Sequence, residues 1–108
     1  MAKFAIFFGL KGETVRGMMD RPSDRTAVVG QMLESVGGHL EAYYLMFGEK
    51  DGMVIGDVPD SKSAATLSLA VSSTGAFSHI ETHELFDPAE MNEMLERAKG
   101  IAYTPPGG

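Results

Sequence analysis

The sequence predicts an α+β domain whose elements follow the order β-α-β-β-α-β, with one further helix after them. Two apolar runs, the first rich in aromatic residues (39–47) and the second in β-branched residues (53–58), flank a short polar turn that contains Asp51 and Gly52, which is typical of a β-hairpin. A helical pattern lies on either side of this hairpin, and a strand-like run lies beyond each helix. This order is the split βαβ arrangement of ferredoxin-like domains with an antiparallel four-stranded sheet.

The opening strand is predicted at residues 3–8. Every side chain from Phe4 to Phe8 is apolar, so both faces of this strand carry apolar groups. A strand with one solvated face would alternate with polar residues, and both faces of this one are therefore expected to be covered. A short helix is predicted next at residues 11–20, because apolar residues recur there at helical spacing before Pro22.

A longer helix precedes the hairpin. It is expected to begin after a capping Ser23 or Asp24 and to end at Gly37 and Gly38. Gly30 lies in the middle of this helix, where glycine weakens helical structure, and it is interpreted as a point of close packing on the sheet. The apolar stripe of the helix comprises Val28, Val29, Met32, Leu33 and Val36.

Both strands of the hairpin again carry apolar residues on both faces. Strict alternation places Tyr43 and Phe47 on one face of the first strand and Tyr44 on the other. On the second strand, Asp57 interrupts an otherwise apolar run just before the turn at Pro59. The hairpin is thus predicted to lie inside the domain, with a single acid near its end.

A helix and a strand are predicted after the hairpin. The helix follows a capping Asp60 or Ser61 and ends at Gly75. Its surface is rich in small residues, as expected where a helix lies close to a sheet. The fourth strand is predicted at residues 76–86.

The last helix has the clearest start signal of the chain. Asp87 is a capping residue, Pro88 occupies the first helical position, and Glu90 can complete a capping box. Gly100 ends the helix, and residues 101–108 are predicted to form an extended tail that docks on a neighbour or stays loose.

Composition excludes several classes of protein. The 108 residues suit one domain, spanning 1–108, and the formal charge of −6 leaves no basic face for nucleic acid or an anionic membrane. The absence of cysteine excludes thiolate metal sites, disulfides and a cysteine nucleophile. No cofactor-binding motif is present, and no transmembrane run or signal segment is found, so a cytoplasmic location is expected.

The sheet is expected to leave one face uncovered. Right-handed crossovers place both main helices of this arrangement on the same face. The other face nevertheless consists of apolar residues, and a bare apolar sheet is an association surface. The sequence therefore predicts a homodimer, or a higher homo-oligomer, in which two sheets pack face to face.

The hairpin and its surroundings closely resemble the small bacterial GYD-domain family. The shared features are a helix-ending Gly-Gly, an aromatic-rich strand, the Gly-Glu-Lys-Asp turn at residues 48–51, and Asp-Val-Pro-Asp at residues 57–60 before an Ala-rich helix. The ending Tyr-Thr-Pro-Pro-Gly at residues 103–107 is also similar. The resemblance implies a ferredoxin-like fold of the dimeric α/β-barrel group and no particular activity. This chain has Lys50 before Asp51, so no role of a turn tyrosine is carried over.

Two acids of the hairpin turn are candidate ligand-binding residues. Glu49 and Asp51 would serve a hard cation or a basic group of a ligand. The alternative is turn chemistry, in which Asp51 bonds local backbone and Glu49 is solvated. Two carboxylates without a further run of oxygen ligands do not make a calcium loop, and this alternative is favoured.

The histidines of the fourth strand raise the question of a metal site. His79, Glu81 and His83 share one face of the predicted strand, and Ile80, Thr82 and Glu84 share the other. Residues four apart on a strand are separated by about 13 Å, too far for both imidazoles to bind one metal ion. A polar, solvated face is favoured, and no metal is assigned.

Four further candidates lie on the hairpin strands. His39, Tyr43 and Phe47 are positioned to line an apolar pocket for a small ligand, or simply to pack in the core and in a dimer contact. Asp57 is a candidate general base or a turn-capping acid.

Two functions remain open, and whether the chain is an enzyme is not decided. The favoured one is a non-catalytic homo-oligomeric domain that binds a small apolar ligand or a partner protein. The alternative is a cofactor-independent oxygenase or isomerase, with Tyr43, Asp57 and His79 as proton-transfer groups.

Overall fold

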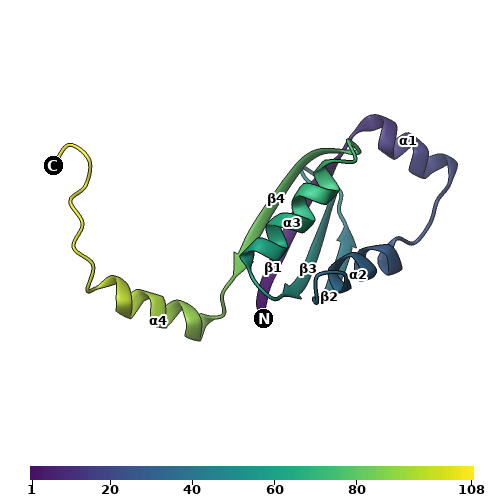
Figure 1. The fold of residues 1–108 in the computed structure, drawn as a ribbon. Coiled ribbons are helices and arrows are strands. Elements are labelled where there is room, and N and C mark those ends of the chain that lie inside the picture. The colour runs from purple at the N-terminus through teal and green to yellow at the C-terminus, as the bar shows by residue number, and fades with distance from the viewer.

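The computed structural model describes residues 1–108 and contains one four-stranded sheet with four helices (Figure 1). The strand order is β2-β3-β1-β4, and every neighbouring pair is antiparallel, which confirms the predicted ferredoxin-like α+β fold. The elements in chain order are β1 (Ala2–Leu10), α1 (Gly12–Asp20), α2 (Thr26–Glu34), β2 (His39–Leu45), β3 (Gly52–Val58), α3 (Ser61–Ser72), β4 (Phe77–Leu85) and α4 (Pro88–Ala98).

Helices α2 and α3 lie on the same face of the sheet, and the core is formed between them and the strands (Figure 1). Helix α2 packs on β2 and β3, whereas α3 packs on β4 and β3. The buried core residues alternate along the strands and recur at helical spacing on the helices, as the sequence pattern requires. They are Phe4, Phe8, Leu33, Val54, Val58, Ala64 and Leu67.

Close packing of α2 on the sheet occurs at a strand glycine. A methyl group on Gly56 of β3 would lie 2.2 Å from Cδ2 of Leu33 and 2.8 Å from the carbonyl oxygen of His39. At Gly30, the helix glycine expected to mark this packing, the nearest atom would be Cδ2 of Leu40 at 3.9 Å. The expectation for Gly30 is therefore wrong, because the backbone of β3, not that of α2, makes the close approach.

The helix starts follow the capping signals of the sequence. Asp60 accepts a hydrogen bond from the backbone N–H of Ser63 at 2.8 Å, and Asp87 with Glu90 forms the predicted capping box of α4. Helix α2 begins at Thr26, and the carboxylate of Asp24 accepts from the Thr26 backbone N–H at 2.9 Å. Hydrogen bonds from Thr26, first from its hydroxyl and then from its backbone, lower the pKa of Asp24.

The face of the sheet opposite α2 and α3 is covered by no element of the chain (Figure 1). We call it the open face. It carries Phe7, Met53 and Ile55, which are only partly buried, and Tyr44, whose exposed fraction is 63%. Both faces of β1 were expected to be covered. Within this chain only the face towards α2 and α3 is covered.

Residues 86–108 extend away from this body, and we call this segment, α4 with the residues on either side of it, the arm (Figure 1). No residue of α4 is buried. The radius of gyration is 17.2 Å, compared with about 13 Å for a compact domain of this length. Helix α1 also buries none of its residues, and it is tied to the body through the hydroxyl of Thr14, which donates to the carbonyl of Ala76. No helix of the structure is long and apolar enough to cross a bilayer.

Candidate functional site

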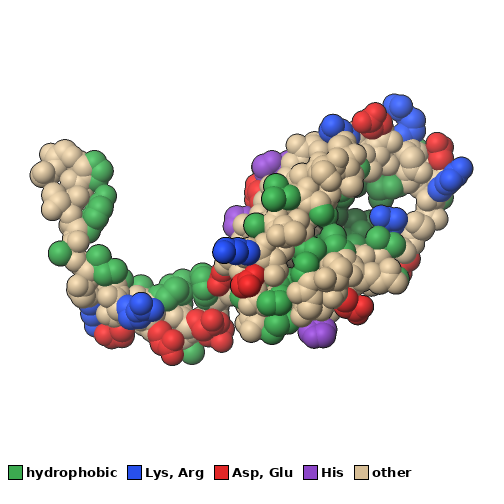
Figure 2. Space-filling view, in the orientation of Figure 1, with side chains coloured by type: hydrophobic (Ala, Val, Ile, Leu, Met, Phe, Trp, Pro, Cys, Tyr) green, Lys and Arg blue, Asp and Glu red, His purple; other side chains and the backbone are tan.

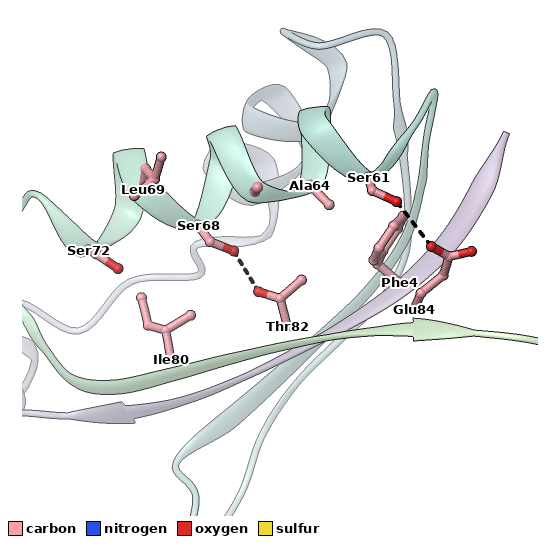
Figure 3. Close-up of a pocket in the computed structure, with 10 residues that line it drawn as sticks. Phe4, Ser61, Ala64, Ser68, Leu69, Ser72, Ile80, Thr82 and Glu84 are labelled. Carbon is pink, nitrogen blue, oxygen red and sulfur yellow. Dashed lines mark hydrogen bonds between the residues drawn. The ribbon is translucent and has the colours of Figure 1, made fainter. Parts of the chain in front are cut away.

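A groove runs between α3 and the edge strand β4 (Figure 3). We call it the α3–β4 groove; its volume is about 580 Å³, and it is open to solvent on one side. Alternate side chains of β4 lie on the helix side of the strand, and these side chains point into the groove. The lining residues are Phe4, Ser61, Ala64, Ala65, Ser68, Leu69, Ser72, Ile80, Thr82 and Glu84.

The groove combines an apolar floor with a short row of polar groups. Phe4 and Ile80 supply apolar surface, and the hydroxyls of Ser68 and Thr82 are hydrogen-bonded to each other at 2.6 Å (Figure 3). At one end the Ser61 hydroxyl donates to Glu84 at 3.2 Å, and Glu84 is the one charged residue of the lining. Apolar walls with a few polar groups are the usual composition of a small-molecule site.

The open face carries a charged cluster at one end. The carboxylate of Glu81 accepts from Nζ of Lys50 at 2.7 Å and lies 2.8 Å from Nε2 of His79 and 3.2 Å from Nε2 of His83. Hydrogen bonds from Lys50, and then from His79 and His83, lower the pKa of Glu81 to about 2. Glu81 is therefore an anion at any physiological pH, and it links the turn before β3 to β4.

A second charged group lies at the opposite end of the open face. Lys3 is paired with Glu41, and its Nζ lies 3.9 Å from Oδ1 of Asp57. Asp57 is opposite both Lys3 and His39 in the strand register. His79, in contrast, is opposite Gly9. Lys3 and Gly9 are six residues apart on β1, so Asp57 and His79 are separated by about 20 Å along the sheet.

The aromatic candidates of β2 are separated by a β-bulge. The register of β2 against β3 shifts between Leu40 and Ala42, so that His39 lies on the open face while Tyr43 packs against the core on the helix side. Burial raises the pKa of Tyr43. Phe47 lies beyond the end of β2 and is fully exposed. The structure therefore does not bring His39, Tyr43 and Phe47 together around one pocket.

The two turn acids have different environments. Oδ2 of Asp51 accepts from the backbone N–H of Leu10 at 2.6 Å, and the backbone N–H of Asp51 donates to the carbonyl of Phe8 at 2.8 Å. Asp51 therefore fastens the hairpin turn to the end of β1. Glu49 is exposed on the same turn.

The sequence did not point to the α3–β4 groove as a site. One signal for it was present, since Ile80, Thr82 and Glu84 were expected on one face of β4 and do line the groove. The α3 residues that line the groove, from Ser61 onward, are mostly serine and alanine. In a sequence these residues resemble ordinary surface residues. None of the seven predicted candidates lines this groove.

The fold and these surfaces define a small α+β domain of ferredoxin-like topology with an uncovered sheet face. The GYD-domain family matches residues 4–95, and the chain belongs to this family. Among solved structures, the chain is similar to MupZ from Pseudomonas fluorescens, with 14% identity and a TM-score of 0.42 over 99% of this chain and 97% of that one. No curated protein matches the chain.

Proposed function

We propose that the chain is a homodimeric domain that pairs through its open face and binds a small apolar ligand in the α3–β4 groove. The observation that carries the proposal is the open face itself, where Phe7, Met53, Ile55 and Tyr44 lie on one uncovered surface. Exposed apolar sheet surfaces of this kind are association sites.

The surface area of the single chain supports this association. The chain exposes 7730 Å² of surface. A compact protein of 11.6 kDa exposes about 5,800 Å², so this chain carries an excess of roughly 1,900 Å². The extended arm and the uncovered open face both contribute to this excess, so a partner that covers them would bring the exposed surface of each chain towards that of a compact protein.

The α3–β4 groove supports the ligand-binding part of the proposal. Small-molecule sites have volumes of roughly 300 to 1,000 Å³, and the groove, at about 580 Å³, lies within that range. Its apolar floor favours a largely apolar ligand, and the hydroxyls of Ser68 and Thr82 supply hydrogen-bonding groups at its centre. A neutral or cationic ligand is favoured over an anion, because Glu84 is the only charge in the lining.

No observation favours the enzymatic alternative. Its proposed proton-transfer groups are spread over the molecule, with Tyr43 on the helix side of the sheet and Asp57 and His79 at opposite ends of the open face. General acid–base catalysis requires such groups within hydrogen-bonding reach of one substrate.

Light scattering on single substitutions tests the association. The unchanged chain is expected to have twice the 11.6 kDa mass of one chain. Tyr44→Asp and Ile55→Asp place a carboxylate on the open face and are expected to give folded monomers, because burying an unpaired charge is costly. Val28→Asp is the matched control, since Val28 is an exposed apolar residue of α2. Circular dichroism checks folding, and Tyr44, on an edge strand, is the more tolerant position.

A monomeric unchanged chain, or a dimer that survives both open-face substitutions, would contradict the proposed association. Ligand binding is measured separately by native mass spectrometry of the purified protein and by the fluorescence of Nile red, a neutral apolar dye. Replacing Ile80 of the groove floor with Asp is expected to abolish dye binding while leaving the dimer mass unchanged. A dye signal that survives Ile80→Asp would contradict the groove as the binding site.

A further inference from the structure

The arm presents an apolar face that nothing in its own chain covers. Figure 2 shows apolar side chains along one side of α4 and acidic groups on the other. Met94, Ala98 and Ile101 line a shallow hollow on this arm together with Arg97. Leu95 is 56% exposed and Ile101 is 71% exposed. We call Met94, Ala98 and Ile101 the apolar strip of the arm, and Arg97 adds a basic group beside it.

A helix of this length requires a partner surface. Isolated helices shorter than about 12 residues are marginal in water, and helical stability in proteins comes mainly from packing an apolar face. Helix α4 has 11 residues, none of them buried. The capping box at Asp87 specifies where the helix begins, but caps alone contribute only about 1 kcal/mol. The apolar strip therefore needs a surface to pack against.

The local structure directs the arm away from its own groove. Only Phe86 and Asp87 connect β4 to α4. The backbone of Asp87 is extended, with φ −74° and ψ 168°, and is held there by the capping box with Glu90 and by the ring of Pro88 at the next position. Because the capping box and Pro88 fix the backbone of Asp87, folding the helix back over β4 would require Phe86 alone to reverse the direction of the chain. A second copy of the chain is the occupant that leaves the link intact.

We infer that the arm of one copy closes the α3–β4 groove of a second copy and forms the missing wall of its ligand site. This inference rests on the proposed dimer and ligand site. The dimensions agree, because α4 is about 16 Å long and α3, which forms one side of the groove, is about 18 Å long. An open groove cannot bury most of a ligand's surface, as small-molecule sites do, and the arm supplies the cover.

Charge fixes the orientation of the arm. The groove has one charged lining residue, Glu84, at the end near Ser61. The apolar side of the arm has one basic residue, Arg97. Pairing Arg97 with Glu84 places α4 antiparallel to α3 and brings Met91 towards Ser72 at the far end of the groove. The enclosed space then lies between the groove floor at Ile80 and the strip of the arm.

Cross-linking between two different single-cysteine chains tests this placement, because the natural chain has no cysteine. Chains carrying Ser72→Cys are mixed with chains carrying Met91→Cys, allowed to exchange, and treated with a short bismaleimide. An arm of one copy lying on the groove of another brings the two cysteines together and speeds formation of the mixed product. The matched control replaces Ser72→Cys by Ser23→Cys, since Ser23 is an exposed serine in the segment between α1 and α2.

The expected result is mixed product from the Ser72→Cys pair at least ten times faster than from the Ser23→Cys control. Equal rates in a protein that is dimeric by light scattering would overturn the arm placement while leaving the proposed dimer intact. Faster reaction of Met91→Cys with Tyr44→Cys would place the arm on the open face and would also overturn it. Cross-linking within one chain of a Ser72→Cys, Met91→Cys double variant that remains monomeric would show that the arm folds onto its own groove. A monomeric unchanged chain would overturn both proposals.

A charge exchange provides a second readout. Arg97→Glu is expected to weaken Nile red binding about two- to fivefold, which is the range for a partly exposed ion pair. Combining it with Glu84→Arg is expected to restore the affinity of the unchanged protein. Failure of the double variant to recover, with each variant still dimeric, would refute the pairing.

Discussion

The contact between Gly56 of β3 and Leu33 of α2 predicts a large difference between two chemically identical substitutions. Gly56→Ala adds a methyl group 2.2 Å from Cδ2 of Leu33 and 2.8 Å from the carbonyl oxygen of His39. Leu33 is almost fully buried, so its side chain has little room to move. Gly30→Ala adds the same methyl group in α2, where the nearest atom is 3.9 Å away.

The expected magnitudes follow from these distances. Overpacking a core by one methyl group costs about 1 to 3 kcal/mol, and the gain from restricting the unfolded chain offsets about 0.4 to 1 kcal/mol of this. Gly56→Ala should therefore lower the free energy of unfolding by about 1 to 2 kcal/mol. Gly30→Ala should raise it by about 0.4 to 1 kcal/mol, because alanine favours the helix and meets no obstacle.

A double-substitution cycle separates the steric contact from other effects. Leu33→Ala alone should cost about 2 to 5 kcal/mol through the cavity it leaves. In the double variant, the methyl group added by Gly56→Ala occupies part of this cavity. The double variant should therefore be more stable, by about 1 kcal/mol or more, than the sum of the two single effects predicts.

The assay is urea unfolding followed by circular dichroism. All variants must be compared at one protein concentration, since the stability of a dimer depends on concentration. If Gly56→Ala is as stable as the unchanged chain, or if the two single effects simply add, α2 does not pack on β3 in the register described here.

Two further predictions concern acids that the sequence singled out or that the structure brings into contact. Asp51→Ala removes the acceptor of the Leu10 backbone N–H and should lower the free energy of unfolding by about 1 to 3 kcal/mol. Glu49→Ala on the same turn should change this free energy by less than about 0.5 kcal/mol. Equal effects of the two substitutions in urea unfolding would refute the structural role of Asp51. The pKa of Glu81 is lowered from 4.5 to about 2, so its contribution to stability is complete above pH 4.5 and is lost as the pH falls through 2. Glu81→Gln should therefore show a smaller loss of stability between pH 4.5 and 2 than the unchanged chain, and superimposable acid-unfolding curves would count against the cluster with Lys50.

The elements of the fold could be predicted because their signals are local. The capping residues Asp60 and Asp87 mark helix starts, and the strand order follows from the sequence of elements with right-handed crossovers. The alternation of Ile80, Thr82 and Glu84 also predicted that these residues share one face of β4, but it did not say whether that face meets the helices; the structure places it on the helix side.

The arrangement of side chains around the sheet could not be predicted in the same way. The bulge between Leu40 and Ala42 moves His39 to the opposite face from Tyr43, and no residue type in this stretch signals an extra residue in the strand. The contact of Lys50 with Glu81 joins residues 31 positions apart, and depends on register. Close packing at Gly56 rather than Gly30 likewise depends on which helix lies above which strand.

The charges of the open face explain why this surface is suited to burial. Its apolar centre around Ile55 lies between two polar ends, which is the usual anatomy of a protein–protein interface. Burying charges costs several kcal/mol each unless they are paired. Here each polar end already holds a cation within the chain, since Glu81 is paired with Lys50 at one end, and Lys3 is paired with Glu41 and lies near Asp57 at the other. A second copy can therefore cover the apolar centre without supplying a partner for Glu81 or Lys3, whereas a new carboxylate at position 55 would find no cation beside it.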